Sequence, residues 1–292
     1  MQVLENRAFP RGDQQMGAEL TSFKSKNAGT EYVWQATLWR GSGTRLSCSD
    51  RRAAQGQDLY RRRQGIRDHP AWLRPRSGMA GEPRERHLRV VHAHAERLHE
   101  KDVSVGLPVH GALYAGRLLA QKGHITENCS DSTMYYEVGG HDAYNLCWQD
   151  GEQVTDYYVA FEGTDKLCRI VTDEAVMLTE ERTDVPLDNG RLPITRELFA
   201  NDAVMAEGLP VRRASIGCTK NSRRVTMDFA DFDYFAVWSP YKDFDVPFVC
   251  LEPWSTLPDG SYLDHAIEHK TGVRVLQPGQ SETLSFTTTV SE

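Results

Sequence analysis

FVCLEPW, the stretch Phe248–Trp254, is a run of aromatic, aliphatic and sulfur-containing residues that contains a single acid, Glu252. Short runs of this composition are typical of a buried β-strand. An acid in such a run is either turned to solvent on an alternating strand or held in a cleft where hydrogen bonds or water compensate its desolvation. The pattern alone slightly favours the first interpretation. Even so, the stretch predicts a strand and makes Glu252 a candidate functional residue.

The chain on either side of this strand continues the β pattern. Turn signals such as LDNGRLP at 187–193 and QPGQ at 277–280 separate the short runs, and helical character is confined to 195–199 and 263–270. The predicted strands cover Val225–Phe229, Tyr234–Trp238, Val273–Leu276 and Thr283–Val290. Many short strands with few helices predict an all-β fold, an antiparallel sandwich or barrel.

The composition of the 292-residue chain excludes several classes of protein. It contains no apolar run near 18 residues, and its first residues are polar and charged rather than apolar as in a secretory signal, so we expect a cytoplasmic protein without a membrane partner. The net charge of −7 argues against nucleic acid as a partner. The six cysteines form no CxxC pair and no cofactor fingerprint is present, so neither a metal nor a cofactor is expected.

Residues of about 42–125 form a window that differs from the rest of the chain. Positions 41–125 hold 14 arginines, two lysines and eight acids, and seven of the ten histidines but none of the ten phenylalanines. A basic arm for nucleic acid would interleave aromatic residues with its cations, which this stretch does not. A disordered charged insertion is the ordinary interpretation of such a composition.

Four stretches resemble the aldose 1-epimerase (galactose mutarotase-like) superfamily, in the bacterial branch near the hexose-6-phosphate 1-epimerases. They are GAEL at 17–20 with EYVWQ at 31–35, TMYYEVGGHDAYN at 133–145, LPITRELFANDAV at 192–204, and FVCLEPW. GGHDAYN and FVCLEPW are the specific ones. The resemblance implies one galactose mutarotase-like domain over 1–292, an antiparallel β-sandwich whose concave sheet holds the sugar. Residues of about 42–125 do not match, so we expect them to be irregular or disrupted.

The resemblance also implies an activity and the residues that perform it. Aldose 1-epimerases interconvert the α and β anomers of a hexose by acid/base ring opening and reclosure, without cofactor or metal. The glutamate of the FVCLEPW motif corresponds to the general base and the histidine of GGHDAYN to the group that protonates the ring oxygen, which makes Glu252 and His141 the catalytic candidates. A carboxylate and an imidazole suit this task, because their ordinary pKa values, about 4.3 and about 6.5, can be brought near neutrality. Asp202, in LFANDAV, resembles the aspartate that binds sugar hydroxyls.

Two motifs that the resemblance implies, a glycine-arginine strand and a histidine-glycine motif followed by arginine, are absent from the window. The permitted codons of 51–76, read one base later, can spell VGRLKDKTYTVDGKEYGITQHGFARD, which contains both motifs. Our hypothesis is that residues of about 42–125 are an out-of-frame translation. Such a window lacks about four strands' worth of alternating apolar residues. Burial of each large apolar side chain contributes about 1.5 to 3 kcal/mol to the free energy of unfolding. We therefore expect the chain in its present reading frame to be poorly folded and inactive.

Two alternative functions stay open. The substrate is either a free hexose or a sugar phosphate, in which case the protein is a hexose-6-phosphate 1-epimerase. The second alternative is a non-catalytic carbohydrate-binding protein on the same fold, since fold does not fix function.

Overall fold

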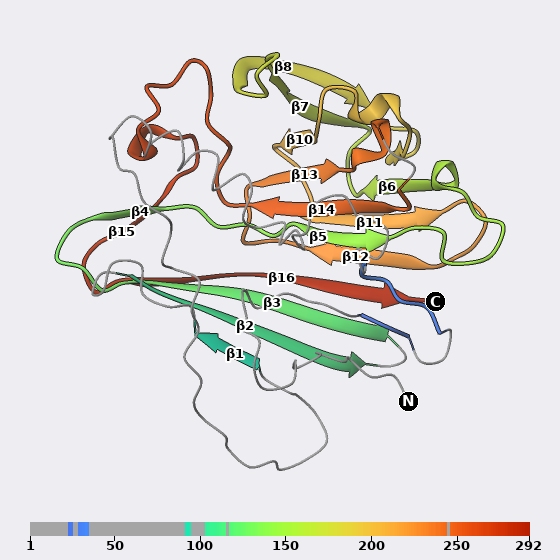
Figure 1. Ribbon diagram of the computed structural model, residues 1–292, viewed down its shortest axis with the longest axis horizontal. Coiled ribbons are helices and arrows are strands. Elements are labelled where there is room, and N and C mark those ends of the chain that lie inside the picture. The colour runs from blue at the N-terminus through green and yellow to red at the C-terminus, as the bar shows by residue number, and fades with distance from the viewer. Residues whose placement is uncertain (1–22, 26–28, 35–90, 95–102, 115–116, 244–245) are drawn as a thin grey trace, which may run out of the picture.

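The computed structural model describes residues 23–25, 29–34, 91–94, 103–114, 117–243 and 246–292 (Figure 1). These residues form sixteen strands in antiparallel sheets, with four 3-10 helices of three residues each between them. The GAEL stretch at 17–20 and most of the window lie outside the described residues. The predicted all-β sandwich is confirmed.

The larger sheet contains eight strands in the order β1-β2-β3-β16-β12-β11-β6-β9. Their bounds are β1 Val91–His94, β2 Val103–Tyr114, β3 Arg117–Asn128, β6 Tyr157–Phe161, β9 Arg191–Pro193, β11 Arg213–Cys218, β12 Arg224–Asp228 and β16 Ser281–Ser291. In Figure 1, β16, β3, β2 and β1 run side by side along the lower part of the molecule.

The second sheet contains six strands in the order β5-β14-β13-β10-β7-β8. Their bounds are β5 Asp142–Asn145, β7 Lys166–Thr172, β8 Leu178–Pro186, β10 Val204–Glu207, β13 Tyr234–Trp238 and β14 Phe248–Trp254. A separate pair joins β4, Met134–Tyr136, to β15, Arg274–Leu276. The 3-10 helices are η1 Val154–Asp156, η2 Glu197–Phe199, η3 Pro240–Lys242 and η4 Ile267–His269.

The main hydrophobic core lies between the two sheets. Alternate residues of the six-stranded sheet, such as Val237 on β13 and Leu251 on β14, pack there with residues of the eight-stranded sheet, such as Ile216 and Met227. This follows from the period of two along a strand, which sends successive side chains to opposite faces.

The opposite face of the six-stranded sheet carries its own smaller cluster. Buried Met205 and Ala236 pack there with Leu257, and the partly buried rings of Trp238 and Trp254 lie against them. Both faces of this sheet are therefore largely covered, which explains why every residue of β14 except Trp254 is buried rather than alternating.

Strands β1, β2 and β3 correct part of the expectation for the window. Residues 91–94, 103–114 and 117–125 are regular strand rather than irregular chain: β3 pairs with β16 from Leu118 to Glu127, and β2 pairs with β3. The physical reason is that a ladder is made by backbone N–H and C=O groups, which almost any side chain leaves available. The β2–β3 register skips the pairs at 107 and 108, where Pro108 supplies no N–H.

The two stretches with helical character form less helix than the sequence predicts. Only η2 and η4, one 3-10 turn each, occur within 195–199 and 263–270, because neither stretch has an apolar stripe long enough to hold a longer helix against a sheet. No helix among the described residues is long and apolar enough to cross a membrane.

Candidate active site

Glu252 lies on β14, which is paired on both sides, with β13 and with β5. Because Leu251 faces the core between the sheets, its neighbours Cys250 and Glu252 face the other side of the six-stranded sheet. The Glu252 side chain is only 1% exposed. The solvent-facing interpretation of this acid is therefore wrong, and a carboxylate so deeply buried needs polar partners to compensate its desolvation.

His141 directly precedes β5 and lies beside Glu252. The last pair of the β5–β14 register joins Asp142 to Leu251, so one further step along both strands sets His141 opposite Glu252. The glycines before it allow this approach. A Cβ on Gly139 would lie 2.8 Å from the carbonyl oxygen of Pro253, and a Cβ on Gly140 would lie 2.7 Å from the Phe286 ring.

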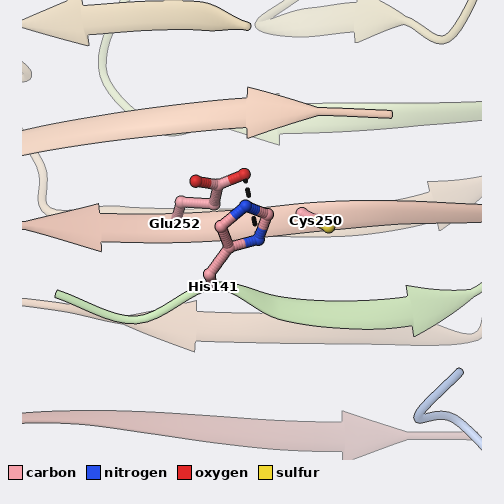
Figure 2. A group of neighbouring side chains, drawn as sticks. All are labelled: His141, Cys250 and Glu252. Atoms are coloured by element: carbon pink, nitrogen blue, oxygen red, sulfur yellow. Dashed lines mark ion pairs between the residues drawn. The ribbon is translucent and has the colours of Figure 1, made fainter. Parts of the chain in front are cut away.

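The side chains of His141 and Glu252 are in direct contact. Nδ1 of His141 lies 3.2 Å from Oε1 of Glu252, and the histidine side chain is 17% exposed. Figure 2 shows the imidazole reaching over β14, between the Glu252 carboxylate and the sulfur of Cys250. One ligand atom from each of these three residues lies within 4.8 Å of the others. A proton acceptor and a proton donor thus share one small region on the face of the six-stranded sheet that points away from the main core.

Asp202 is linked to this pair through Trp238. Asp202 lies in the turn between η2 and β10 with φ of 63°, a conformation that aspartate tolerates better than most residues. Its Oδ1 accepts a hydrogen bond from Nε1 of Trp238 at 2.7 Å. The same indole packs edge-on against the His141 imidazole, with ring centroids 5.7 Å apart. The structure therefore brings all three predicted site residues to one region.

Arg169, on β7, lies near Asp202. Its Nη2 lies 3.4 Å from the carbonyl oxygen of Asn201 and 3.5 Å from that of Ala203. Burial lowers the pKa of the Arg169 guanidinium, and the nearby Asp202 carboxylate opposes that shift. A half-buried cation thus lies next to the aspartate that the sequence predicts to bind sugar hydroxyls.

Comparisons with known proteins agree with this architecture. No protein-family model matches the chain. The plasmid form of protein LacX from Lactococcus lactis subsp. lactis is 26% identical over 286 residues, which cover 94% of each chain. A galactose mutarotase-like protein from Lactobacillus casei ATCC 334 superposes with a TM-score of 0.69 at 21% identity over 99% of both chains. A galactose mutarotase related enzyme from Lactobacillus acidophilus gives 0.65 at 23% identity, over 95% of this chain and 92% of the other. This chain has the galactose mutarotase-like fold.

Sequence reasoning missed two residues of the site in this mutarotase-like fold, Cys250 and Trp238. Both could have been found from strand geometry. Cys250 is two residues from Glu252 on the same strand and must share its face. Trp238 is the cross-strand partner of Cys250, so it also lies on that face.

Proposed function

We propose that the protein is an aldose 1-epimerase, an isomerase that interconverts the α and β anomers of a hexose. The observation that carries the proposal is the contact between His141 and Glu252, 3.2 Å apart on the face of the six-stranded sheet that points away from the main core. The mutarotase-like fold, shared with the galactose mutarotase related enzyme from Lactobacillus acidophilus, supports the same assignment.

Mutarotation needs two coordinated proton movements, and this pair can supply both. The Glu252 carboxylate accepts the proton of the anomeric hydroxyl while protonated His141 gives a proton to the ring oxygen, which breaks the bond between C1 and that oxygen. The C1 carbonyl then rotates and presents its other face. On reclosure His141 takes back the proton as the ring oxygen attacks C1, and protonated Glu252 returns its proton to the former carbonyl oxygen, which becomes the new anomeric hydroxyl.

Asp202 is proposed to bind sugar hydroxyls, oriented by Trp238. The indole N–H of Trp238 binds Oδ1 of Asp202 and so fixes the orientation of the carboxylate. The remaining lone pairs of the carboxylate can accept hydrogen bonds from the sugar. The Trp238 ring contacts both the aspartate and the catalytic histidine, so it sets the position of the binding group relative to the acid/base pair.

We further propose that residues 1–292 act as one domain in the cytoplasm. Among the described cysteines, Cys129, Cys147, Cys168 and Cys218 form no disulfide, which fits a reducing compartment.

The direct test is anomer exchange followed by polarimetry or by NMR exchange spectroscopy. The exchange rates of freshly dissolved α anomers of a free hexose and of its 6-phosphate are measured with and without the protein. The compound whose exchange the protein accelerates more identifies the substrate class. A protein that only binds carbohydrate would perturb the sugar resonances without changing the exchange rate of either compound, and that result would contradict the proposal.

A further inference from the structure

We propose that His141, Cys250 and Glu252 form a binding site for one divalent transition metal of the zinc class, and that this metal blocks the acid/base pair. The metal site depends only on the geometry of the three side chains. Its inhibitory effect rests on the proposed function.

The spacing of the ligand atoms suits a small ion. Two oxygen or nitrogen ligands at about 2.1 Å from a tetrahedral zinc ion lie about 3.4 Å apart. His141 Nδ1 and Glu252 Oε1 are already 3.2 Å apart. One ring nitrogen of His141, the Cys250 sulfur and one carboxylate oxygen of Glu252 all lie within 4.8 Å of one another. A rotation of the thiol side chain toward the other two atoms completes a three-ligand set, which leaves a fourth position for water.

The scaffold under these ligands is rigid. Cys250 and Glu252 come from one face of β14, which is hydrogen-bonded to a neighbouring strand on each side. His141 is fixed by the backbone contact of Gly140 N with the carbonyl oxygen of Pro253 at 2.9 Å. Ligands on paired strands keep their mutual geometry, which lowers the ordering cost of binding a metal.

The ligand types select the metal. A thiolate with an imidazole favours Zn²⁺ and its neighbours in the first transition row, whereas Mg²⁺ and Ca²⁺ prefer oxygen ligands. Cys250 is fully buried, while the His141 side chain is 17% exposed, so the ion approaches from the histidine side. Because the thiol must release its proton, the affinity rises with pH.

Occupancy of the site and proton transfer exclude each other. A bound metal uses the lone pair of His141 Nδ1 and an oxygen of Glu252, so these atoms no longer exchange protons with the sugar. Zn²⁺ therefore inhibits anomer exchange in competition with the substrate, and a chelator restores the rate.

Cobalt titration of the full chain tests the site without reference to activity. Co²⁺ bound to a thiolate gives a sulfur-to-metal charge-transfer band in the near ultraviolet. We expect the band in the wild-type protein and its loss in Cys250→Ala and in Cys250→Ser, with Zn²⁺ affinity by calorimetry reduced at least about tenfold. The matched control is Cys218→Ala, which removes a buried thiol from β11 in the other sheet and keeps the band. Absence of the band in the wild type, or its persistence in a folded Cys250 variant, overturns the site.

The second arm measures the ratio of exchange rates with and without Zn²⁺. We expect a fall of at least about tenfold in the wild type and a ratio close to one in Cys250→Ala, with Mg²⁺ inactive in both. If the protein shows the thiolate band but does not accelerate anomer exchange, the metal site is confirmed and the proposed function is contradicted. If the protein accelerates anomer exchange but shows no band, the proposed function is confirmed and the metal site is contradicted.

Discussion

Nδ1 of His141 lies 3.2 Å from Oε1 of Glu252, which joins a residue of β14 to the residue that directly precedes the neighbouring strand β5. The backbone hydrogen bond from Gly140 N to the carbonyl oxygen of Pro253 ties the segment before β5 to β14, which holds the proton donor and the proton acceptor close together.

Replacing Glu252 with Gln removes the base while keeping its size and its capacity to hydrogen-bond. We expect the rate of anomer exchange to fall by about 10² to 10⁴ with little change in melting temperature. The matched control is Glu162→Gln, whose side chain is 55% exposed and remote in the sequence from the site motifs. Equal rates for Glu252→Gln and the wild type in polarimetry would remove Glu252 from the mechanism.

Trp238→Phe keeps an aromatic ring beside His141 but deletes the N–H that binds Asp202. Since this bond orients the aspartate, we expect a rise in KM of about tenfold with a smaller change in kcat, and a similar rise for Asp202→Asn. The double variant should have a KM no higher than that of Asp202→Asn alone, because Trp238 is proposed to act through Asp202. Additive losses in steady-state kinetics would show that the two residues act separately.

Gly140→Ala introduces a Cβ 2.7 Å from the Phe286 ring. We expect the free energy of unfolding to fall by about 1 to 3 kcal/mol, measured by denaturant titration. Phe286→Leu makes room at this point, so it should recover part of the loss in the Gly140→Ala background although it destabilises the wild type. Failure of the second change to compensate would indicate that the glycine is needed for another reason.

His124, on β3, should make stability depend on pH. It is 8% exposed, and among the described residues its Nε2 has no hydrogen-bond partner. Burial, assisted by Lys122, lowers the pKa of His124 to about 4, and Asp142 opposes the shift. The unfolded chain takes up the proton near pH 6.5 while the folded chain does so only near pH 4. The free energy of unfolding therefore falls as the pH drops through this range, by about 3 kcal/mol for this group.

The test of this effect is the melting temperature between pH 7 and pH 4 for the wild type and for His124→Phe. The variant should show a shallower decline, since its ring is not protonated. His269→Gln, which alters a side chain that is 60% exposed, serves as the control and should follow the wild type. Identical slopes in all three proteins would contradict the assignment.

The window of about 42–125 leads to a prediction about the gene and about stability. Of the residues in the main core cluster between the sheets, only Ala120 comes from the window, among those that the structure describes. We expect the coding bases to spell the shifted motifs, and a chain with the restored reading frame to melt at a higher temperature and exchange anomers faster than the printed chain. Coding bases that cannot spell these motifs would end the hypothesis, and a cooperative melt with full activity in the printed chain would contradict the expected loss of folding.

The sequence predicted the strands around the site well. The residues of β14, β13 and β12 form short apolar or alternating runs, and no helical pattern competes with them. It predicted the window poorly. Strands β2 and β3 contain few of the aromatic residues that mark a strand, and their pairing with β16 comes from backbone groups that composition does not reveal.

The all-β class follows from the pattern of short apolar runs, and the motifs point to His141, Asp202 and Glu252, since residue type and period along a strand are local properties. The burial of Glu252, and the position of Cys250 and Trp238 beside it and His141, emerge only from the folded arrangement of the strands. The physical reason is that strand register and sheet order are set by non-local backbone pairing, and these pairings bring distant segments within contact distance.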